Sequence, residues 1–524
     1  MKKLLSIVLV MAMLLSLAIA IPVSADTTTE TVSKWDGTIP TLATDATLAT
    51  LFEGEGTEAS PYLLKTAEDV AELAAYVNSR TSSSTETTSN KYFRLDCDID
   101  IADQQWPGIG AMTNTTLASN GGATNVDTSP SFQGKFDGNG HVVYNLNFKS
   151  SSLLTGFFNC VTTDKAIISN FGIVSGNITL TPTSSIYAGA LVGYLGNKAQ
   201  IKNCFNMADI DVAVKATSIV GGLVGWIDGG AIGNAVYANI IDGCWNSGDI
   251  NIINSHVHAK VGGIVGQKAS SSGLWINNTT NIGNITNDKN ATQYSGFGGV
   301  IGEMGTGLLK CSFVNIGGNI SVGLSTNYDW NTVAEPVGVA FGYAGNITPT
   351  IESCNYNTTV TLDEVKQNSP LIYGYDYNSN ATTNFTKVES ITISDTTMLS
   401  NNFAQNGIDE NAGNIRFVSE LGFSAGAFSE TGYVVEFNGT PANKNLCGKV
   451  VYTSLKVADK TAEGGYKTIT PTGKYYIAYG VSGVSGVSGT VTVTPYVVLL
   501  DGTTTVYGAS AEYTITAGVL QQNS

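Results

Sequence analysis

The stretch "SIVGGLVGWIDGG" (residues 218–230) contains a glycine-bracketed apolar step, GGLVG, at 221–225. The chain repeats this step as GALVG (189–193), GGIVG (262–266), GGVIG (298–302) and GVAFG (338–342). Self-similarity at a period of tens of residues indicates a solenoid, a propeller or an array. The glycines of the step are Gly189, Gly193, Gly221, Gly222, Gly225, Gly262, Gly263, Gly266, Gly298, Gly299, Gly302, Gly338 and Gly342.

A second pattern recurs out of phase with the glycines. Short segments such as NITL (177–180) and DIDV (209–212) alternate polar and apolar residues, as expected of strands with one apolar face. β-branched residues dominate the apolar positions, and helix-length amphipathic runs are absent. The pattern predicts an all-β parallel solenoid in which each coil buries its neighbour's apolar face. The anchoring residues are Ile178, Ile210, Ile250, Ile285, Ile320 and Val360.

Glycine and asparagine would both serve the corners of such coils. Glycine permits either a positive φ or an approach too close for a Cβ atom. Asparagine either pairs its amide with the next coil, ~4.8 Å away, or supplies ordinary turn chemistry. No phosphate-binding glycine motif is present. The asparagines before the strands are Asn206, Asn246, Asn281, Asn315 and Asn357.

The chain has seven cysteines, an odd number with wide spacing. Four of them lie between a glycine step and the next alternating segment, which indicates small inward-facing residues. We therefore expect buried free thiols rather than disulfides, which the secreted context would also permit. These four are Cys204, Cys244, Cys311 and Cys354.

The segment "AGALVGYLGNKAQIKNCFNMADIDV" (188–212) resembles the GLUG motif of bacterial secreted and surface proteins, as does 221–252. The resemblance covers about residues 130–365, and "FQGKFDGNGHVVYNLNF" (132–148) is similar to the usual lead-in. It implies a right-handed parallel β-helix and transfers no catalytic residue. Two repeats depart from the pattern, because Thr279 replaces a cysteine and Val339 replaces the second glycine.

The segments outside the repeats predict a leader, an N-terminal cap and a C-terminal domain. We expect a signal peptide at 1–25, with Lys2 and Lys3 before an apolar run and a Val-Ser-Ala cleavage site, the alternative being an N-terminal membrane anchor. An extended segment (26–53) and a cap with the first coils (54–130) would follow, including one helix near 67–79 with Thr66 as N-cap. The GLUG-type repeats would occupy 131–375, a linker or last coil 376–413, and an antiparallel β-sandwich 414–524. That sandwich is similar to C-terminal β domains of secreted clostridial-type proteins.

The net charge of the chain restricts the classes of partner that it can bind. Without Lys2 and Lys3, 24 of the 26 basic residues remain against 42 acidic ones, a net charge of −18. Nucleic-acid binding needs basic residues that neutralise phosphates, so we expect no nucleic-acid partner, and no membrane insertion beyond the leader. The chain is expected to be secreted, and to lie free or at the cell surface.

Known chemistry of parallel β-helices is not recognisable in the sequence. The acid, histidine and arginine segments of polygalacturonase-like sites are missing, and 130–365 contains no arginine for a lyase. Asp96, Asp98 and Asp100 alternate along one segment and would either bind Ca²⁺ or form a solvated face. His256 and His258 would either share a zinc ion or have no ligand role. We expect no other cofactor.

These observations leave three functional hypotheses. The first is a non-catalytic binding protein for glycans, matrix or cell-surface proteins, with Trp226, Trp245 and Trp275 as candidate ligand-stacking residues, unless they fill space in the coil. The second is a carbohydrate-active enzyme with an unfamiliar acid pair. The third is a structural spacer or surface-layer component.

Overall fold

The structure is a computed structural model. It describes residues 32–112, 116–117, 123–124, 130–148, 153–181, 185–213, 217–229, 238–253, 258–270, 272–291, 295–324, 337–345, 347, 349–356, 358–363, 365–367, 371–376, 385–387, 397–400, 415–421, 428–438, 440–448, 455–458, 466–469, 475–481, 488–499, 505–516 and 519–522. The chain divides into a β-helix unit (Thr28–Cys354 and Thr358–Thr386) and a C-terminal unit containing Lys387–Ser524. Each is described by itself.

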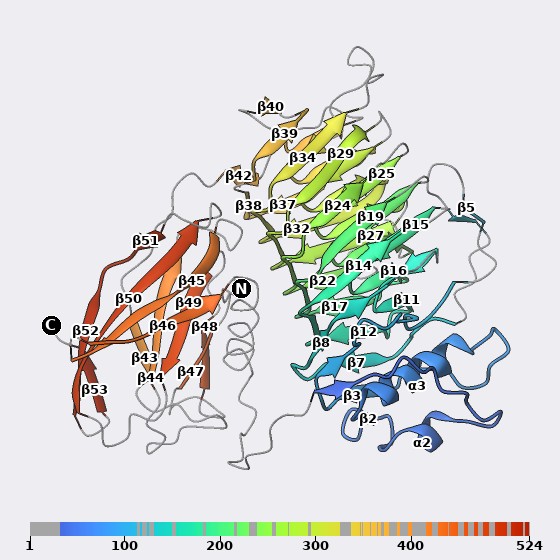
Figure 1. The fold of residues 1–524 in the computed structure, drawn as a ribbon, viewed down its shortest axis with the longest axis horizontal. Coiled ribbons are helices and arrows are strands. Elements are labelled where there is room, and N and C mark those ends of the chain that lie inside the picture. The colour runs from blue at the N-terminus through green and yellow to red at the C-terminus, as the bar shows by residue number, and fades with distance from the viewer. Residues whose placement is uncertain are drawn as a thin grey trace. The chain divides into compact units, whose positions relative to one another are not determined.

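Over the described residues, five sheets of stacked short strands form the β-helix (Figure 1). We number them I to V in the order in which a coil visits them. Sheet I contains β10 (Leu154–Thr155), β15 (Ile186–Gly189), β20 (Ser218–Gly221), β25 (Ala259–Gly262), β30 (Gly296–Gly298) and β35 (Val337–Gly338). Sheet II contains β11 (Phe158–Thr162), β16 (Val192–Gly196), β21 (Val224–Asp228), β26 (Val265–Lys268), β31 (Ile301–Met304), β36 (Phe341–Ala344) and β41 (Tyr373–Asp376).

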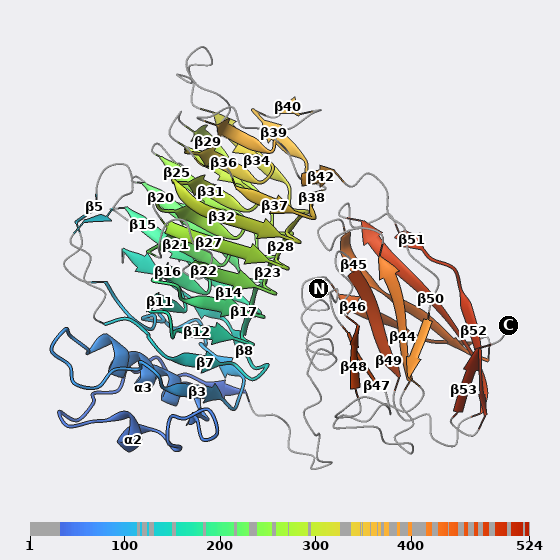
Figure 2. The ribbon, with the colours of Figure 1, turned by 180° about the vertical axis from the view of Figure 1, so that it is seen from behind.

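Sheets III to V complete each coil, and Figure 2 shows the stack from behind. Sheet III contains β2 (Tyr62–Leu64), β3 (Tyr92–Leu95), β7 (Lys135–Asp137), β12 (Ile167–Ser169), β17 (Gln200–Lys202), β22 (Asn239–Asp242), β27 (Ser272–Asn277), β32 (Gly307–Ser312) and β37 (Thr350–Glu352). Sheet IV contains β1 (Ser33–Lys34), β4 (Ile99–Asp100), β8 (Val142–Tyr144), β13 (Gly172–Ile173), β18 (Phe205–Asn206), β23 (Trp245–Asn246), β28 (Thr280–Asn281), β33 (Asn315–Ile316), β38 (Cys354–Tyr356) and β42 (Phe385–Lys387). Sheet V contains β9 (Leu146–Asn147), β14 (Gly176–Leu180), β19 (Asp209–Ala213), β24 (Ile250–Ile253), β29 (Ile285–Ala291), β34 (Ile320–Leu324), β39 (Val360–Leu362) and β40 (Val365–Lys366), of which only β40 pairs antiparallel.

The register confirms the predicted solenoid and its repeat. Neighbouring strands of sheet V place the anchoring residues side by side, so that Ile178 pairs with Ile210 and Ile320 pairs with Val360. All the anchors are at most 2% exposed. The first glycines of the step are aligned in the same way along sheet I. One apolar residue per coil therefore forms a continuous column inside the helix.

The glycine step joins sheet I to sheet II and brings their backbones together. A Cβ atom on Gly189 would lie 2.6 Å from the backbone nitrogen of Gly225 in the next coil, and one on Gly262 would lie 2.7 Å from that of Gly302. Real Cβ atoms do not approach closer than about 3.0 Å. None of the motif glycines, all of which are described, has a positive φ. Of the two reasons for glycine, close approach is the one that applies.

The left-handed corner lies elsewhere, between sheets III and IV. In six successive coils one residue has a positive φ there, one or two residues before the strand of sheet IV begins. Asparagine and glycine tolerate this conformation, whereas a side chain such as that of Phe313 is strained in it. The corner residues are Asn170, Asn203, Gly243, Asn278, Phe313 and Ser353.

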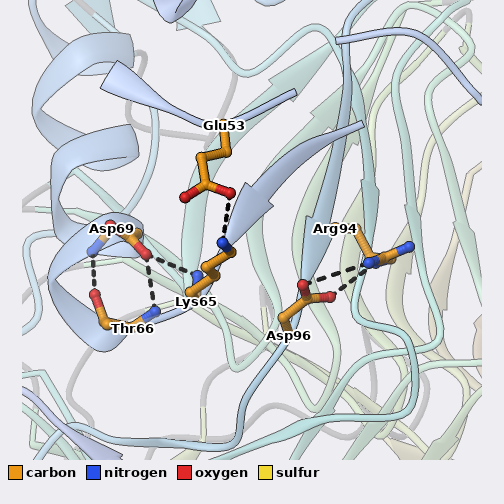
Figure 3. A network of polar contacts seen from close by, with 6 residues as sticks. All are labelled: Glu53, Lys65, Thr66, Asp69, Arg94 and Asp96. Carbon is orange, nitrogen blue, oxygen red and sulfur yellow. Dashed lines mark hydrogen bonds and ion pairs between the residues drawn. The ribbon is translucent and has the colours of Figure 1, made fainter. Parts of the chain in front are cut away.

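A helical cap covers the first coils, as predicted. Helix α3 spans Ala67–Asn78, and its start is fixed by a capping box: Asp69 N–H donates to Thr66 Oγ1 (3.1 Å), and Thr66 N–H donates to Asp69 Oδ2 (2.9 Å; Figure 3). The predicted apolar stripe, including Val70 and Leu73, is buried. An N-terminal residue that accepts and returns a hydrogen bond in this way stabilises the first turn.

The preceding segment is not merely extended, so the expectation for 26–53 is wrong over its described part. β1 pairs with β4 in sheet IV, and a short helix, α2, spans Leu48–Leu51. Trp35 is 1% exposed and packs edge-on against Trp106 at 5.2 Å between ring centroids. Residues 32–53 therefore belong to the cap. A small hairpin, β5 (Thr116–Leu117) with β6 (Ala123–Thr124), also precedes the repeats.

The C-terminal unit is the predicted antiparallel sandwich. One sheet contains β43 (Thr397–Ser400), β44 (Ile415–Leu421) and β49 (Tyr475–Val481). The other contains β45 (Phe428–Phe437), β46 (Thr440–Gly448), β50 (Gly489–Leu499), β51 (Thr505–Tyr507), β52 (Ala511–Thr516) and β53 (Val519–Gln522), and a hairpin joins β47 (Leu455–Ala458) to β48 (Tyr466–Ile469). The rings of Phe417 and Tyr513 meet between the two sheets at 5.1 Å.

The boundary between the units differs from the expected linker. β42 closes sheet IV of the β-helix, whereas β43 already pairs antiparallel with β44 in the C-terminal unit. The region 376–413 is thus shared by both units. The sequence also predicts a strand at 449–457, but the structure has β46 before it and β47 at its end, and 449–454 lie outside the described residues.

Candidate functional site

Trp226 is not an exposed ligand-stacking residue, which corrects the prediction. It is 2% exposed and lies between sheets I and II. The ring of Tyr187, one coil earlier, stacks on it at 4.6 Å, and Tyr194 meets it edge-on at 5.0 Å. Trp226 therefore fills space in an apolar cluster with Leu154, Cys160 and Ile219. The alternative hypothesis, that this tryptophan fills space in the coil, is therefore confirmed for Trp226.

Sheets I and II meet in a seam, and facing residues in it come from successive coils. The seam consists of Leu154, Tyr187, Ile219, Lys260 and Gly296 from sheet I and of Cys160, Tyr194, Trp226, Gln267, Glu303 and Tyr343 from sheet II, each set in register along its sheet. The N-terminal half of the seam, from Leu154 to Trp226, is apolar, and the C-terminal half, from Lys260 to Tyr343, is polar. Nothing in the sequence pattern marks this pairing, because it depends on how closely the two sheets approach.

A buried lysine, Lys268, lies at the edge of the seam. Lys268 is fully buried, and its ammonium donates to the carbonyl oxygen of Thr306 at 2.8 Å. Burial lowers the pKa of Lys268 to about 8, while the charge of Asp228 acts in the opposite direction. Burial also raises the pKa of Asp228. A lysine held by backbone carbonyls in this way closes the loop that follows β31.

Trp245 lies on the outer face of sheet IV. Its neighbour Asn246 points inward and is fully buried, so Trp245 points the other way, and it is half-buried. The ring of Phe205, one coil earlier, stacks on it at 4.6 Å with an interplanar angle of 6°. Phe205 in turn lies over Gly172, where a Cβ atom would collide with the phenyl ring. The indole is therefore held in one orientation with part of its surface open.

Trp275 lies on the outer face of sheet III, one coil further along. It alternates with buried Leu274 and Ile276 and is half-buried. The Lys310 ammonium lies 5.6 Å from the centroid of its ring and pairs with Glu352 at 3.4 Å. A cation at this distance is attracted to the indole face. Trp245 and Trp275 thus flank the corner between sheets III and IV. We call Phe205, Trp245 and Trp275 the aromatic ridge.

The three aspartates are not brought together on one strand face, contrary to the sequence-based picture. Asp96 pairs with Arg94 at 2.8 Å (Figure 3), beyond the end of β3. Asp98 lies at the corner and contacts His141 Nδ1 at 3.0 Å. Asp100 lies in β4 and accepts from Asn145 Nδ2 at 2.7 Å. Because the chain turns between sheets III and IV here, each carboxylate has its own partner.

No metal centre is visible in the described part of the chain, which contains no group of three or more His, Cys, Asp or Glu side chains suited to hold an ion. His256 lies outside the described residues. Burial lowers the pKa of His258, and the nearby charge of Lys260 adds to the effect. The two histidines are therefore not shown to share a ligand.

Three of the predicted asparagines form a buried amide ladder. Asn206 Nδ2 donates to Asn246 Oδ1, and Asn246 Nδ2 donates to Asn281 Oδ1, both at 2.9 Å. Asn315 is not part of the ladder, because the register places Ile316 beside Asn281. One additional residue separates Asn315 from the next sheet V anchor. Asn357 lies outside the described residues.

The cysteines are buried free thiols, as expected, but they do not form one column. Cys204 and Cys244 are neighbours in consecutive coils, where Cys204 N–H donates to the sulfur of Cys244 at 3.5 Å. Cys311 belongs to a sheet III column instead, between Ile276 and Ile351. Val314 takes the position equivalent to Cys354 and donates its N–H to that sulfur at 3.4 Å. Burial raises the thiol pKa of Cys244 to about 12, so these thiols are unreactive.

Comparisons with known proteins do not name a function. No model of a known protein family matches the chain, and the search of curated proteins finds no match. Among solved structures, the chain is similar to one described as a "putative immunoglobulin A1 protease" from Bacteroides ovatus, with 18% sequence identity, a TM-score of 0.41, and coverage of 64% of this chain and 86% of that chain. At that TM-score the similarity supports no inference about activity. Within the described residues, no helix has the length and apolar character of a membrane span.

Proposed function

We propose that this chain is a secreted or cell-surface protein whose β-helix binds an extended glycan along the aromatic ridge, without catalysis. The observation that carries the proposal is the pair of half-buried indoles of Trp245 and Trp275 on neighbouring outer faces. Both rings are held in place, one by Phe205 and the other beneath Lys310. Fixed aromatic faces bind sugar rings at little cost in side-chain entropy.

The repeat geometry supports an extended ligand. Successive coils stack at the strand spacing of about 4.8 Å, so the faces next to the ridge present polar side chains at regular intervals. Along sheet V, Asn251 Nδ2 donates to Asp211 Oδ1 at 2.8 Å, and Thr286 Oγ1 donates to Asn251 Oδ1 at 2.6 Å. Such ordered, half-buried polar side chains suit a polymer rather than a small molecule. The leader-like sequence at 1–25 and the resemblance to GLUG-motif proteins support an extracellular location.

The test is retention of polysaccharides by the purified chain on a glycan array or an affinity gel. We expect selective retention of at least one polysaccharide without any product. Trp245→Ala and Trp275→Ala should each abolish it, whereas Tyr507→Ala, which removes a 58% exposed aromatic ring from the C-terminal unit, should not. Released oligosaccharides would instead identify an enzyme, and no retention at all would favour a structural spacer.

A further inference from the structure

The charged half of the seam contains a lysine and a glutamate in direct contact. Lys260 Nζ, in sheet I, contacts a carboxylate oxygen of Glu303, in sheet II of the next coil. The Lys260 side chain is 8% exposed and that of Glu303 is 16% exposed. The ammonium also lies 5.2 Å from the ring centroid of Tyr343. Water is therefore largely excluded from both functional groups.

The fold holds these two side chains together from both sides. In the same seam Tyr187 faces Trp226 one coil later, so the Lys260–Glu303 pair follows the geometry of the apolar half. One coil further, Gly296 lies so close to Tyr343 that a Cβ atom added to the glycine would be 3.1 Å from the Cβ of the tyrosine, so the two sheets stay close beside the pair. Two reactive groups fixed at contact distance behave as if present at an effective concentration of roughly 10⁵ M or more.

Burial favours the uncharged form of the Lys260 amine. Transfer of an ion pair out of water costs several kcal/mol per ion, and mutual attraction repays it only with further hydrogen bonds. Burial lowers the pKa of Lys260 to about 8, so about a tenth of the amine is unprotonated at pH 7. Transfer of one proton from the ammonium to the carboxylate gives a neutral amine beside a neutral carboxylic acid.

A neighbouring amide has a buried oxygen atom that accepts no hydrogen bond from the described residues. Gln267 is 7% exposed, and its Oε1 is buried without a hydrogen bond. It is the cross-strand neighbour of Glu303 in sheet II, as Ile219 is of Lys260 in sheet I. A buried amide oxygen can only accept hydrogen bonds, so beside Glu303 it favours the protonated carboxyl group, whose O–H can donate to it.

We propose that Lys260 and Glu303 form an intramolecular isopeptide bond. The neutral Lys260 amine attacks Cδ of the protonated Glu303 carboxyl group, a C–N bond forms, the C–OH bond breaks, and one water molecule leaves. The nitrogen retains one hydrogen, so no oxidant, reductant or energy source is required. The bond links sheet I of one coil to sheet II of the next and closes a 43-residue segment. This modification is independent of glycan binding.

Peptide mapping of the full chain tests the proposal. The chain is produced without any added enzyme, denatured, digested with trypsin and analysed by mass spectrometry. Trypsin does not cleave after an amidated lysine, so we expect a branched peptide that joins 216–268 to 290–310 and is lighter than the two by one water. Recovery of 216–260, 261–268 and 290–310 as separate peptides, which requires cleavage after Lys260, would overturn the proposal whatever the variants show.

Three variants assign the bond. Lys260→Met and Glu303→Leu each remove one partner and should eliminate the branched peptide. Lys268→Met is the matched control, because Lys268 is an equally buried lysine in the same seam region whose ammonium contacts backbone carbonyls. It should retain the branched peptide in full, with its first arm extended to 216–289 because the variant lacks the tryptic site at 268. A branched peptide that disappears in Lys268→Met and persists in Glu303→Leu would assign the bond to another pair and contradict the proposal.

Discussion

Trp226 and Trp245 lie in the same coil, yet one is buried and the other is partly open. Trp226 faces a second sheet, whose Tyr187 stacks on its ring, and Tyr194 of its own sheet meets the ring edge-on. Trp245 lies on the outer face of its sheet, where, among the described residues of the β-helix, the ring of Phe205 stacks on it. In a β-helix, the exposure of a side chain is therefore decided by what lies against its sheet. The residue type alone does not distinguish a core tryptophan from a ligand-stacking one.

The largest expected effect separates the two tryptophans. Trp226→Ala should lower the free energy of unfolding of the β-helix by about 3–5 kcal/mol, because it leaves a cavity in the seam. Chemical denaturation followed by circular dichroism measures this value. Trp245→Ala should lower the free energy of unfolding clearly less, because its ring is only half-buried. The same variant should abolish glycan retention. Equal losses of stability in the two variants would refute the distinction between a seam and a ridge.

The next test concerns the close approach that buries Trp226. Gly262→Ala should cost about 3 kcal/mol, the upper part of the range for overpacking, because its Cβ would collide with backbone atoms of two coils. Gly140→Ala is the control: its φ is +86°, but nothing lies within 4 Å of an added Cβ, so strain alone should cost about 1–2 kcal/mol. Thermal unfolding of both variants measures the difference. A Gly140 variant less stable than the Gly262 variant would indicate that conformation, not space, selects the motif glycines.

A third test compares buried and open amides of one coil. Asn246→Ala should cost about 2 kcal/mol, because it removes one hydrogen bond to each neighbouring coil and leaves a buried acceptor on Asn281. Asn251→Ala removes a similar bond to Asp211 from the half-buried ladder of sheet V and should cost less than about 1 kcal/mol. Urea denaturation of the two variants provides the values. Comparable losses would show that burial does not strengthen the ladder.

The sequence was sufficient for the architecture because each coil repeats its apolar anchor. The alignment of Ile178 with Ile210 follows from the strand pattern alone. Assigning equivalent positions in different coils by residue type gave wrong matches where a repeat gains or loses a residue. Asn315 was grouped with the ladder, whereas a position four residues before the anchor, as at Asn281 and Ile285, would have identified Ile316. The signal was spacing from the strand, not the identity of the side chain.

The site was less predictable than the fold. The burial of Trp226 and the contact between Lys260 and Glu303 arise from two sheets that meet across coils. No periodicity in one strand encodes the distance to another sheet. The separation of Asp96 from Asp100 was missed for a related reason, because a corner interrupts what looks like one strand. Local patterns determine which residues point inward, while contacts between sheets need the assembled coil.

The smallest expected effect concerns the left-handed corner that sets Trp245 and Trp275 on different faces. Asn203 has φ +52°, is exposed, and donates from Nδ2 to Asn170 Oδ1 at 3.2 Å. Asn203→Ala should lower the free energy of unfolding by about 1 kcal/mol, because alanine tolerates this conformation less well than asparagine. Asn203→Gly loses the same hydrogen bond but retains the conformational freedom, so it should lie within about 0.5 kcal/mol of the parent. If both variants lose the same stability, the amide contact rather than the backbone conformation accounts for asparagine at this corner.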